Sequence, residues 1–196
     1  MARIAVTDGM SNDAIAILEN AGHEVVLRHH DTEEIAKGSL AVFDAVVIRS
    51  ATKLYAEQIS ASVNISGGIR FIGRAGVGVD NIDIDEASKK GITVCNTPGA
   101  STRSVVELTI GHLIASTRHI TTADRTLRNG VWAKKQLRGS EIGGKRLGLI
   151  GFGRISRGVA SIASSFGMEV HAFDPFVNEA PEGVQFHDDV DEIFRT

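Results

Sequence analysis

A glycine turn between an apolar run and a helical stretch constrains the fold of this chain more than any other feature. Residues 146–150 are mostly apolar, as in a buried strand, and Gly151-Phe152-Gly153 follows them directly. Residues 155–166 then have helical periodicity. Gly151 permits a tight turn, and Gly153 lets the backbone approach a bound group closely. We therefore predict a strand–turn–helix unit of an α/β fold, with a ligand site where the helix begins.

An acidic residue, Asp174, follows the next predicted strand, residues 169–173. A dinucleotide-binding unit needs such a residue about 20 positions after its glycines, where the carboxylate accepts hydrogen bonds from a ribose diol. The same carboxylate repels a 2′-phosphate, so we expect NAD rather than NADP as the cofactor. Ser156 stands where a third glycine is usual, and we expect it to weaken the match only modestly. The alternative is an ordinary strand–turn–helix whose glycines serve the turn alone.

Short β-branched runs alternate with amphipathic stretches through the first hundred residues, which predicts a small doubly wound domain. A helix capped by Ser11 and ended near Gly22 separates the first two strands. The predicted strands are residues 4–7, 24–27, 45–48, 69–72 and 92–95, and the further helices are residues 31–37, 55–62 and 84–90. We assign residues 1–98 to a first domain and residues 99–196 to a second.

The second domain is predicted to open with a long helix from Ser101, apolar around much of its circumference. Such a helix is expected to be buried between domains or subunits. Residues 121–144 are polar and contain Trp132 as one large apolar anchor. After the glycine turn, residues 184–186 can supply a third strand and residues 188–194 the start of a helix.

The composition argues against several classes of partner. The formal net charge is -3 and only 5% of the residues are aromatic, so we expect no nucleic-acid partner. No apolar stretch approaches the roughly 18 residues of a membrane span, and no secretory signal is visible. The single cysteine, Cys95, lies in an apolar run and is expected to be a buried, inert thiol. Together these features favour a cytoplasmic protein.

Several linked motifs resemble the D-isomer-specific 2-hydroxyacid dehydrogenase family over essentially the whole chain. They are residues 48–53 (Ile-Arg-Ser-Ala-Thr-Lys), 73–83 (Gly-Arg-Ala-Gly-Val-Gly-Val-Asp-Asn-Ile-Asp), 96–102 (Asn-Thr-Pro-Gly-Ala-Ser-Thr) and 173–175 (Phe-Asp-Pro). The resemblance implies a flavodoxin-like substrate-binding domain followed by an incomplete Rossmann nucleotide-binding domain. The interval from Arg49 to Arg74 is longer than the family pattern, which suggests a loop variation around Ser66-Gly67-Gly68.

The resemblance also implies a substrate site in the first domain. Arg49, Ser50 and Arg74 match positions that contact an anionic substrate, and a guanidinium suits a carboxylate or phosphate. The backbone amides of Ala75 and Gly76 match the loop that approaches the substrate carboxylate. Without the resemblance, either arginine would be read as a solvated surface charge.

Cofactor contacts follow from the same resemblance. Val77 matches a contact on the nicotinamide side, and Arg154 and Ile155 match residues that flank the pyrophosphate. Gly151, Gly153 and Asp174 complete the expected NAD site. The helix from Ser101 matches a two-fold dimer interface, so a homodimer is expected.

The implied activity is NAD-dependent oxidation of a 2-hydroxy acid. We favour oxidation of 3-phosphoglycerate to 3-phosphohydroxypyruvate in serine biosynthesis, with glycerate or lactate as alternative substrates. The family's catalytic histidine, glutamate and arginine match no segment here, so we assign no catalytic residue and no metal. We expect this sequence to be an N-terminal piece that is inactive by itself. The alternative is a non-catalytic nucleotide-binding or dimerising fragment.

Overall fold

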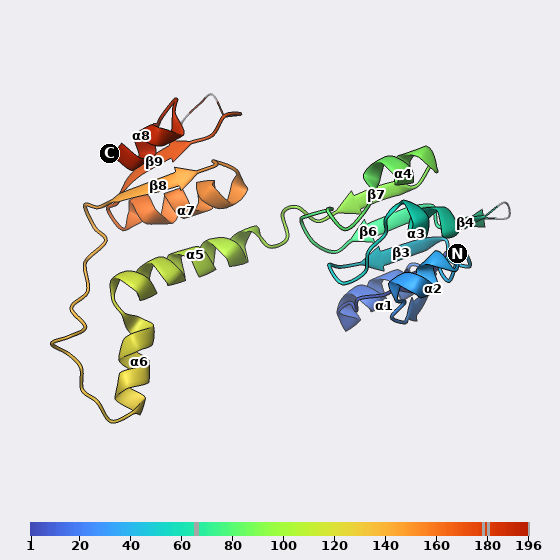
Figure 1. The fold of residues 1–196 in the computed structure, drawn as a ribbon, viewed down its shortest axis with the longest axis horizontal. Helices are drawn as coiled ribbons and strands as arrows, with labels where there is room; N and C mark the ends of the chain where they lie inside the picture. Colours follow the sequence, from blue (N-terminus) through green and yellow to red (C-terminus); the bar gives the residue numbers. More distant parts are fainter. Residues whose placement is uncertain (65–66, 178, 180, 196) are drawn as a thin grey trace. The chain divides into compact units, whose positions relative to one another are not determined.

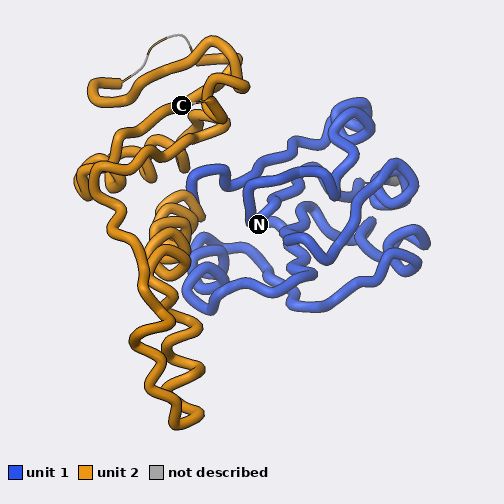
Figure 2. The backbone as a smooth tube through the Cα atoms, turned by 60° about the vertical axis from the view of Figure 1, so that its left-hand side comes forward, with its two compact units in different colours: residues 1–100 blue, residues 101–196 orange. Residues whose placement is uncertain are grey.

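The computed structural model describes residues 1–64, 67–177, 179 and 181–195. The chain forms two compact units, Met1–Ala100 and Ser101–Thr196 (Figure 2). Each unit has its own apolar core and its own parallel sheet.

The first unit is built on a five-stranded parallel sheet in the order β2-β1-β3-β6-β7. Figure 1 labels β3, β6 and β7 of this sheet. Leaving aside a short hairpin, this is the flavodoxin-like order 2-1-3-4-5, and the predicted fold is confirmed. The strands are β1 (Arg3–Val6), β2 (Glu24–Leu27), β3 (Ala45–Ile48), β6 (Phe71–Arg74) and β7 (Thr93–Asn96). The hairpin pairs β4 (Val63–Asn64) with β5 (Gly67–Gly68).

Four helices accompany these strands: α1 (Asn12–Asn20), α2 (Thr32–Ala36), α3 (Ala56–Ala61) and α4 (Ile84–Lys89). The Ser11 hydroxyl accepts a hydrogen bond from the Ala14 N–H and caps α1, as its side-chain chemistry predicts. Helices α2 and α3 lie side by side, as do α3 and α4. They bury Ile35, Ile59 and Ala87 in one apolar cluster with the strands.

Two predictions for this unit need correction. Strand β6 begins at Phe71 rather than at residue 69, because the backbone N–H of Ile69 donates to Ser62 O beside the hairpin. Cys95 is exposed, not buried, because it lies on β7, an edge strand of the sheet. The expected loop variation falls partly outside the described residues, since Ser66 is not among them.

The second unit holds a three-stranded parallel sheet in the order β10-β9-β8. Its strands are β8 (Arg146–Ile150), β9 (Glu169–Phe173) and β10 (Val184–Phe186), and its helices are α5 (Thr102–Thr117), α6 (Ile120–Arg128), α7 (Arg154–Ser165) and α8 (Val190–Arg195). The order 3-2-1 is that of one Rossmann half. Helix α7 packs on α5 and on β9, and α8 packs on β8 and β9.

The segment between α5 and the second sheet differs most from expectation. Helix α6 was not predicted, although Ile120, Ala123 and Leu127 have helical spacing. Trp132 is 75% exposed, so within this chain it is no anchor. Helix α5 buries only Val106 and Ile110, and Leu108 remains 59% exposed.

Candidate functional sites

The turn from β8 into α7 has the geometry that its glycines predict. Gly151 adopts φ +85°, a left-handed conformation that favours glycine, and its N–H donates to Phe173 O at 2.8 Å. Gly153 is the N-cap of α7, with no side-chain capping bond. A Cβ placed on either glycine would meet nothing within 4 Å. The space over the helix start is therefore open, and helix N–H groups point into it as they would toward a pyrophosphate.

Phe152, between the two glycines, anchors this turn in the core. Its ring is fully buried and meets Phe186 edge-on at 5.3 Å between centroids. The Arg157 guanidinium lies 5.2 Å from the Phe152 ring centroid, and Arg157 Nε donates to Phe152 O at 3.2 Å. Neither the contact with Phe186 nor that with Arg157 was predicted. The aromatic residue between the two glycines was the sequence feature that could have indicated a buried anchor at this turn.

Asp174 lies against the same turn. Its Oδ2 accepts the Phe152 N–H at 2.7 Å, and its Oδ1 accepts the Phe176 N–H at 2.8 Å. These bonds, with that to Phe152 the strongest cause, lower the pKa of Asp174. The carboxylate is thus ionised near neutral pH, and its remaining lone pairs are those a ribose diol would use. The structure brings Asp174 and the Gly151–Gly153 turn together.

Ser156 occupies the position of the third glycine, and Gly158, two residues later, has a separate packing role. Ser156 is half-buried in the first turns of α7. Gly158 is where close packing demands glycine, because a Cβ there would lie 2.7 Å from Val106 Cγ2 on α5. Gly158 therefore permits close approach between two helices, at a position that the fingerprint does not include.

The predicted substrate residues gather at the carboxyl ends of β3 and β6. These strands pair with Ile48 opposite Arg74, so Arg49 and Ala75 begin neighbouring loops. Strands β1 and β3 flank the point where the strand order reverses, which is where ligands bind in open α/β sheets. Arg49 and Ser50 are both exposed there.

Arg74 and the loop after it are held more tightly. The Arg74 guanidinium folds over Gly76, where a Cβ would collide with it, and Arg74 Nε is buried with no hydrogen-bond partner. Gly76 O accepts the Thr97 N–H at 2.9 Å. The 46% exposed Val77 is fixed through its carbonyl, which accepts from Asn96 Nδ2 at 2.6 Å.

The predicted residues thus form two groups, one in each unit. Arg49, Ser50 and residues 74–77 share one sheet edge of the first unit. Gly151, Gly153, Asp174 and the α7 residues Arg154 and Ile155 share the β8–α7 turn of the second. In the described part of the chain, no cluster of metal-ligating residues occurs and no helix is long and apolar enough to cross a membrane.

A flavodoxin-like unit has Arg49 at its switch point and Arg74 at the end of the neighbouring strand β6. Joined to a Rossmann half with a glycine turn, it defines the class as an α/β protein with the architecture of dinucleotide-binding enzymes. The catalytic-domain profile of the D-isomer specific 2-hydroxyacid dehydrogenases matches residues 4–183. The chain belongs to this family, as its motifs indicated.

Characterised relatives share the sequence over nearly the whole chain. A hydroxypyruvate reductase of Thermotoga maritima is 43% identical over 194 residues, which are 98% of this chain and 61% of the relative. A D-3-phosphoglycerate dehydrogenase of Methanocaldococcus jannaschii is 42% identical over 198 residues, with 100% of this chain and 37% of the relative covered. The chain therefore spans less than two thirds of the length of either relative.

Solved structures share the fold. The TT0316 protein of Thermus thermophilus superposes with a TM-score of 0.85 at 28% identity, covering 97% of this chain and 61% of that one. An NAD-dependent formate dehydrogenase of Staphylococcus aureus, in complex with NAD, gives 0.81 at 25% identity and covers 97% of this chain and 61% of that one.

Proposed function

We propose that the full-length protein is an NAD-dependent dehydrogenase of D-2-hydroxy acids. The observation that carries this proposal is the open β8–α7 turn with the Asp174 carboxylate beside it. NAD would lie with its pyrophosphate over Gly153, Arg154 and Ile155 and its adenosine ribose on Asp174, while Val77 is proposed to contact the nicotinamide side. When bound, NAD accepts the hydride from the substrate. The residues of this chain bind and orient the two reactants.

The proposed substrate is 3-phosphoglycerate, which would place the enzyme in serine biosynthesis. This molecule carries a carboxylate and a phosphate, and Arg49 and Arg74 offer two guanidinium groups to two anions. Ser50 and the amides of Ala75 and Gly76 would complete the contacts. The Methanocaldococcus jannaschii relative supports this choice, whereas the Thermotoga maritima relative favours the glycerate and hydroxypyruvate pair.

The test is turnover by the full-length protein, followed through NADH absorbance with 3-phosphoglycerate, glycerate and lactate. Activity with 3-phosphoglycerate supports the proposal. Activity with glycerate alone would change the assigned substrate to glycerate and leave the proposed reaction type unchanged. Replacing NAD+ with NADP+ in a parallel assay tests the expected preference of Asp174 for NAD. If NADH binds but no 2-hydroxy acid is oxidised, the non-catalytic alternative holds.

We also propose a cytoplasmic location, because a chain with a single cysteine cannot form an internal disulfide and suits a reducing compartment.

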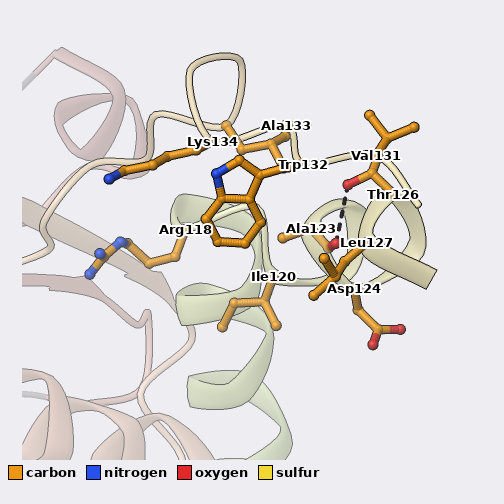
Figure 3. Close-up of a pocket in the computed structure, with 11 residues that line it drawn as sticks. Arg118, Ile120, Ala123, Asp124, Thr126, Leu127, Val131, Trp132, Ala133 and Lys134 are labelled. Atoms are coloured by element: carbon orange, nitrogen blue, oxygen red, sulfur yellow. Dashed lines mark hydrogen bonds between the residues drawn. The ribbon is translucent and has the colours of Figure 1, made fainter. Parts of the chain in front are cut away.

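We also propose a homodimer formed through the α5–α6 region. Residues of helix α6, together with residues 131–134 and Leu137, line a mostly apolar pocket of about 620 Å³, with Trp132 and Ile120 pointing into it (Figure 3). Leu127, Val131 and Trp132 are each more than half exposed, which is costly unless a partner covers them. Light scattering of Trp132→Ser should show dissociation. Phe176→Ser, which removes an even more exposed aromatic ring elsewhere in the unit, should remain dimeric.

A further inference from the structure

Two side chains from distant parts of the first unit grip the turn formed by residues 49–52. Asp8 Oδ2 accepts the backbone N–H groups of Arg49 at 2.6 Å and Thr52 at 3.0 Å. Asn81 Nδ2 donates to the backbone carbonyls of the same two residues, at 2.7 Å and 2.8 Å. Each end of the turn is therefore held at both its N–H and its C=O.

The base of this grip is buried. Thr52 is 3% exposed and Asn81 is 2% exposed. The Thr52 hydroxyl donates to Asp8 Oδ1 at 2.6 Å and lies 2.8 Å from the Thr7 hydroxyl. The backbone of Asn81 is fixed in turn, because its carbonyl accepts the Leu54 N–H at 2.9 Å. The four bonds to the backbone of Arg49 and Thr52 therefore restrict the motion of the turn.

The top of the turn has the opposite character. Arg49 and Ser50 are exposed, at the switch point of the sheet. A flexible loop would have to be ordered when it meets a ligand, and that ordering would weaken binding. A loop tied down at both ends presents its side chains and amides already in place.

We propose that Asp8 and Asn81 are positioning residues that preorganise the residue 49–52 turn for a carboxylate or phosphate group of the substrate. This inference rests on the proposed function, because it takes that turn to be part of the substrate site. Neither residue needs to touch the substrate; each acts through the backbone of Arg49 and Thr52.

The experiment measures kcat and KM for the active 2-hydroxy acid, and the Kd for NADH, in the full-length enzyme. Asp8→Ala and Asn81→Ala should each raise KM about ten- to a hundredfold, as expected for misplaced binding groups, with kcat changing less. The Kd for NADH should stay within about twofold, since the proposed cofactor residues of the second unit are untouched. Asp8→Asn should recover most of the loss, because its carboxamide oxygen accepts the same two N–H groups.

Asp44 provides a matched control in the same sheet. Its Oδ2 accepts the Arg3 N–H at 2.8 Å and its Oδ1 accepts from Arg70 at 3.2 Å, but these bonds lie at the amino ends of the strands. Asp44→Ala removes a backbone-binding carboxylate from the unit and should leave KM unchanged. Asn81→Ala, which leaves Asp8 and its bonds in place, is the second variant if Asp8→Ala fails to fold.

Three outcomes would overturn the inference. In the first, the wild-type enzyme is active and Asp8→Ala has the same KM as the control Asp44→Ala. In the second, Asp8→Asn raises KM as much as Asp8→Ala does. The side-chain oxygen that accepts the two backbone N–H groups would then not be what positions the turn. Where Asp8→Ala does not fold, a wild-type KM in Asn81→Ala has the same meaning, because that variant removes the two bonds to the backbone carbonyls of the turn. A wild-type enzyme that oxidises no 2-hydroxy acid instead refutes the proposed function, and the inference falls with it.

Discussion

Gly158 offers the sharpest test of how α5 and α7 are packed. The residue lies in the interior of α7, and a Cβ there would lie 2.7 Å from Val106 Cγ2 and 3.5 Å from Val106 Cγ1. Valine is stiff at χ1 in a helix, so Val106 cannot turn aside cheaply. We expect Gly158→Ala to push the two helices apart.

The magnitude combines two opposed effects. Replacing glycine by alanine in a helix interior stabilises it by about 1 kcal/mol. Overpacking a well-filled contact costs about 1–3 kcal/mol. The net change should be a loss of up to about 2 kcal/mol in the free energy of unfolding. In a Val106→Ala background the obstacle is gone, so Gly158→Ala should instead stabilise the protein by about 1 kcal/mol.

Urea unfolding of the four proteins in this double-mutant cycle, followed by far-ultraviolet circular dichroism, measures the coupling. We expect an interaction energy of about 1–3 kcal/mol between positions 106 and 158. Gly111→Ala is the matched control, because Gly111 lies within α5 and a Cβ there meets nothing within 4 Å. It should stabilise the protein by about 1 kcal/mol. If Gly158→Ala stabilises the protein equally with and without Val106, the packing argument is wrong.

Three further predictions concern other parts of the chain. Burial, followed by the nearby His187, lowers the pKa of His171 below its ordinary 6.5, so the fold favours the neutral ring. That contribution to stability is present above pH 6.5 and is lost as the pH falls through the lowered folded-state pKa. Urea unfolding at a series of pH values should therefore show the free energy of unfolding falling with pH in this range. His171→Gln should reduce this dependence on pH, whereas His112→Gln, at an exposed site, should leave it unchanged. Asp174→Asn should raise the Kd for NADH about tenfold, measured by fluorescence titration, and should reduce the ratio between the Kd values for NADPH and NADH. If both Kd values are unchanged, Asp174 does not contact the ribose. Cys95 should react with a thiol reagent in the native protein, and protection until denaturant is added would contradict its exposure.

Local chemistry explains why much of the fold could be predicted from the sequence. Strand β3 is a nearly unbroken apolar run because it is the middle strand of the five-stranded sheet. Helix α1 begins where Ser11 caps it, and the turn after β8 follows from the conformational freedom of Gly151. In the last two cases the cause lies within a few residues of its effect.

Exposure was harder to predict, since it depends on what covers a residue. Cys95 lies in a strand-like run, yet the position of β7 at the sheet edge leaves the thiol uncovered. Trp132 has the size of a core anchor, but the chain around it supplies too few neighbours to bury the ring. Helix α6 was missed because its mean character is polar, although its apolar residues recur at helical spacing.

The two kinds of site residue differ in the same way. A residue that faces a ligand tends to follow a strand directly, because the loops after parallel strands meet at one edge of the sheet. Asp174 after β9 could therefore be proposed from its spacing, whereas Arg49 after β3 was proposed only through the family resemblance. A residue that holds such a loop is under no such constraint: Asp8 reaches across 41 positions to Arg49, and Asn81 across 32. The side chains proposed to face ligands could thus be predicted from motifs in the sequence, whereas the residues that hold the backbone of Arg49 and Thr52 could be identified only in the folded chain.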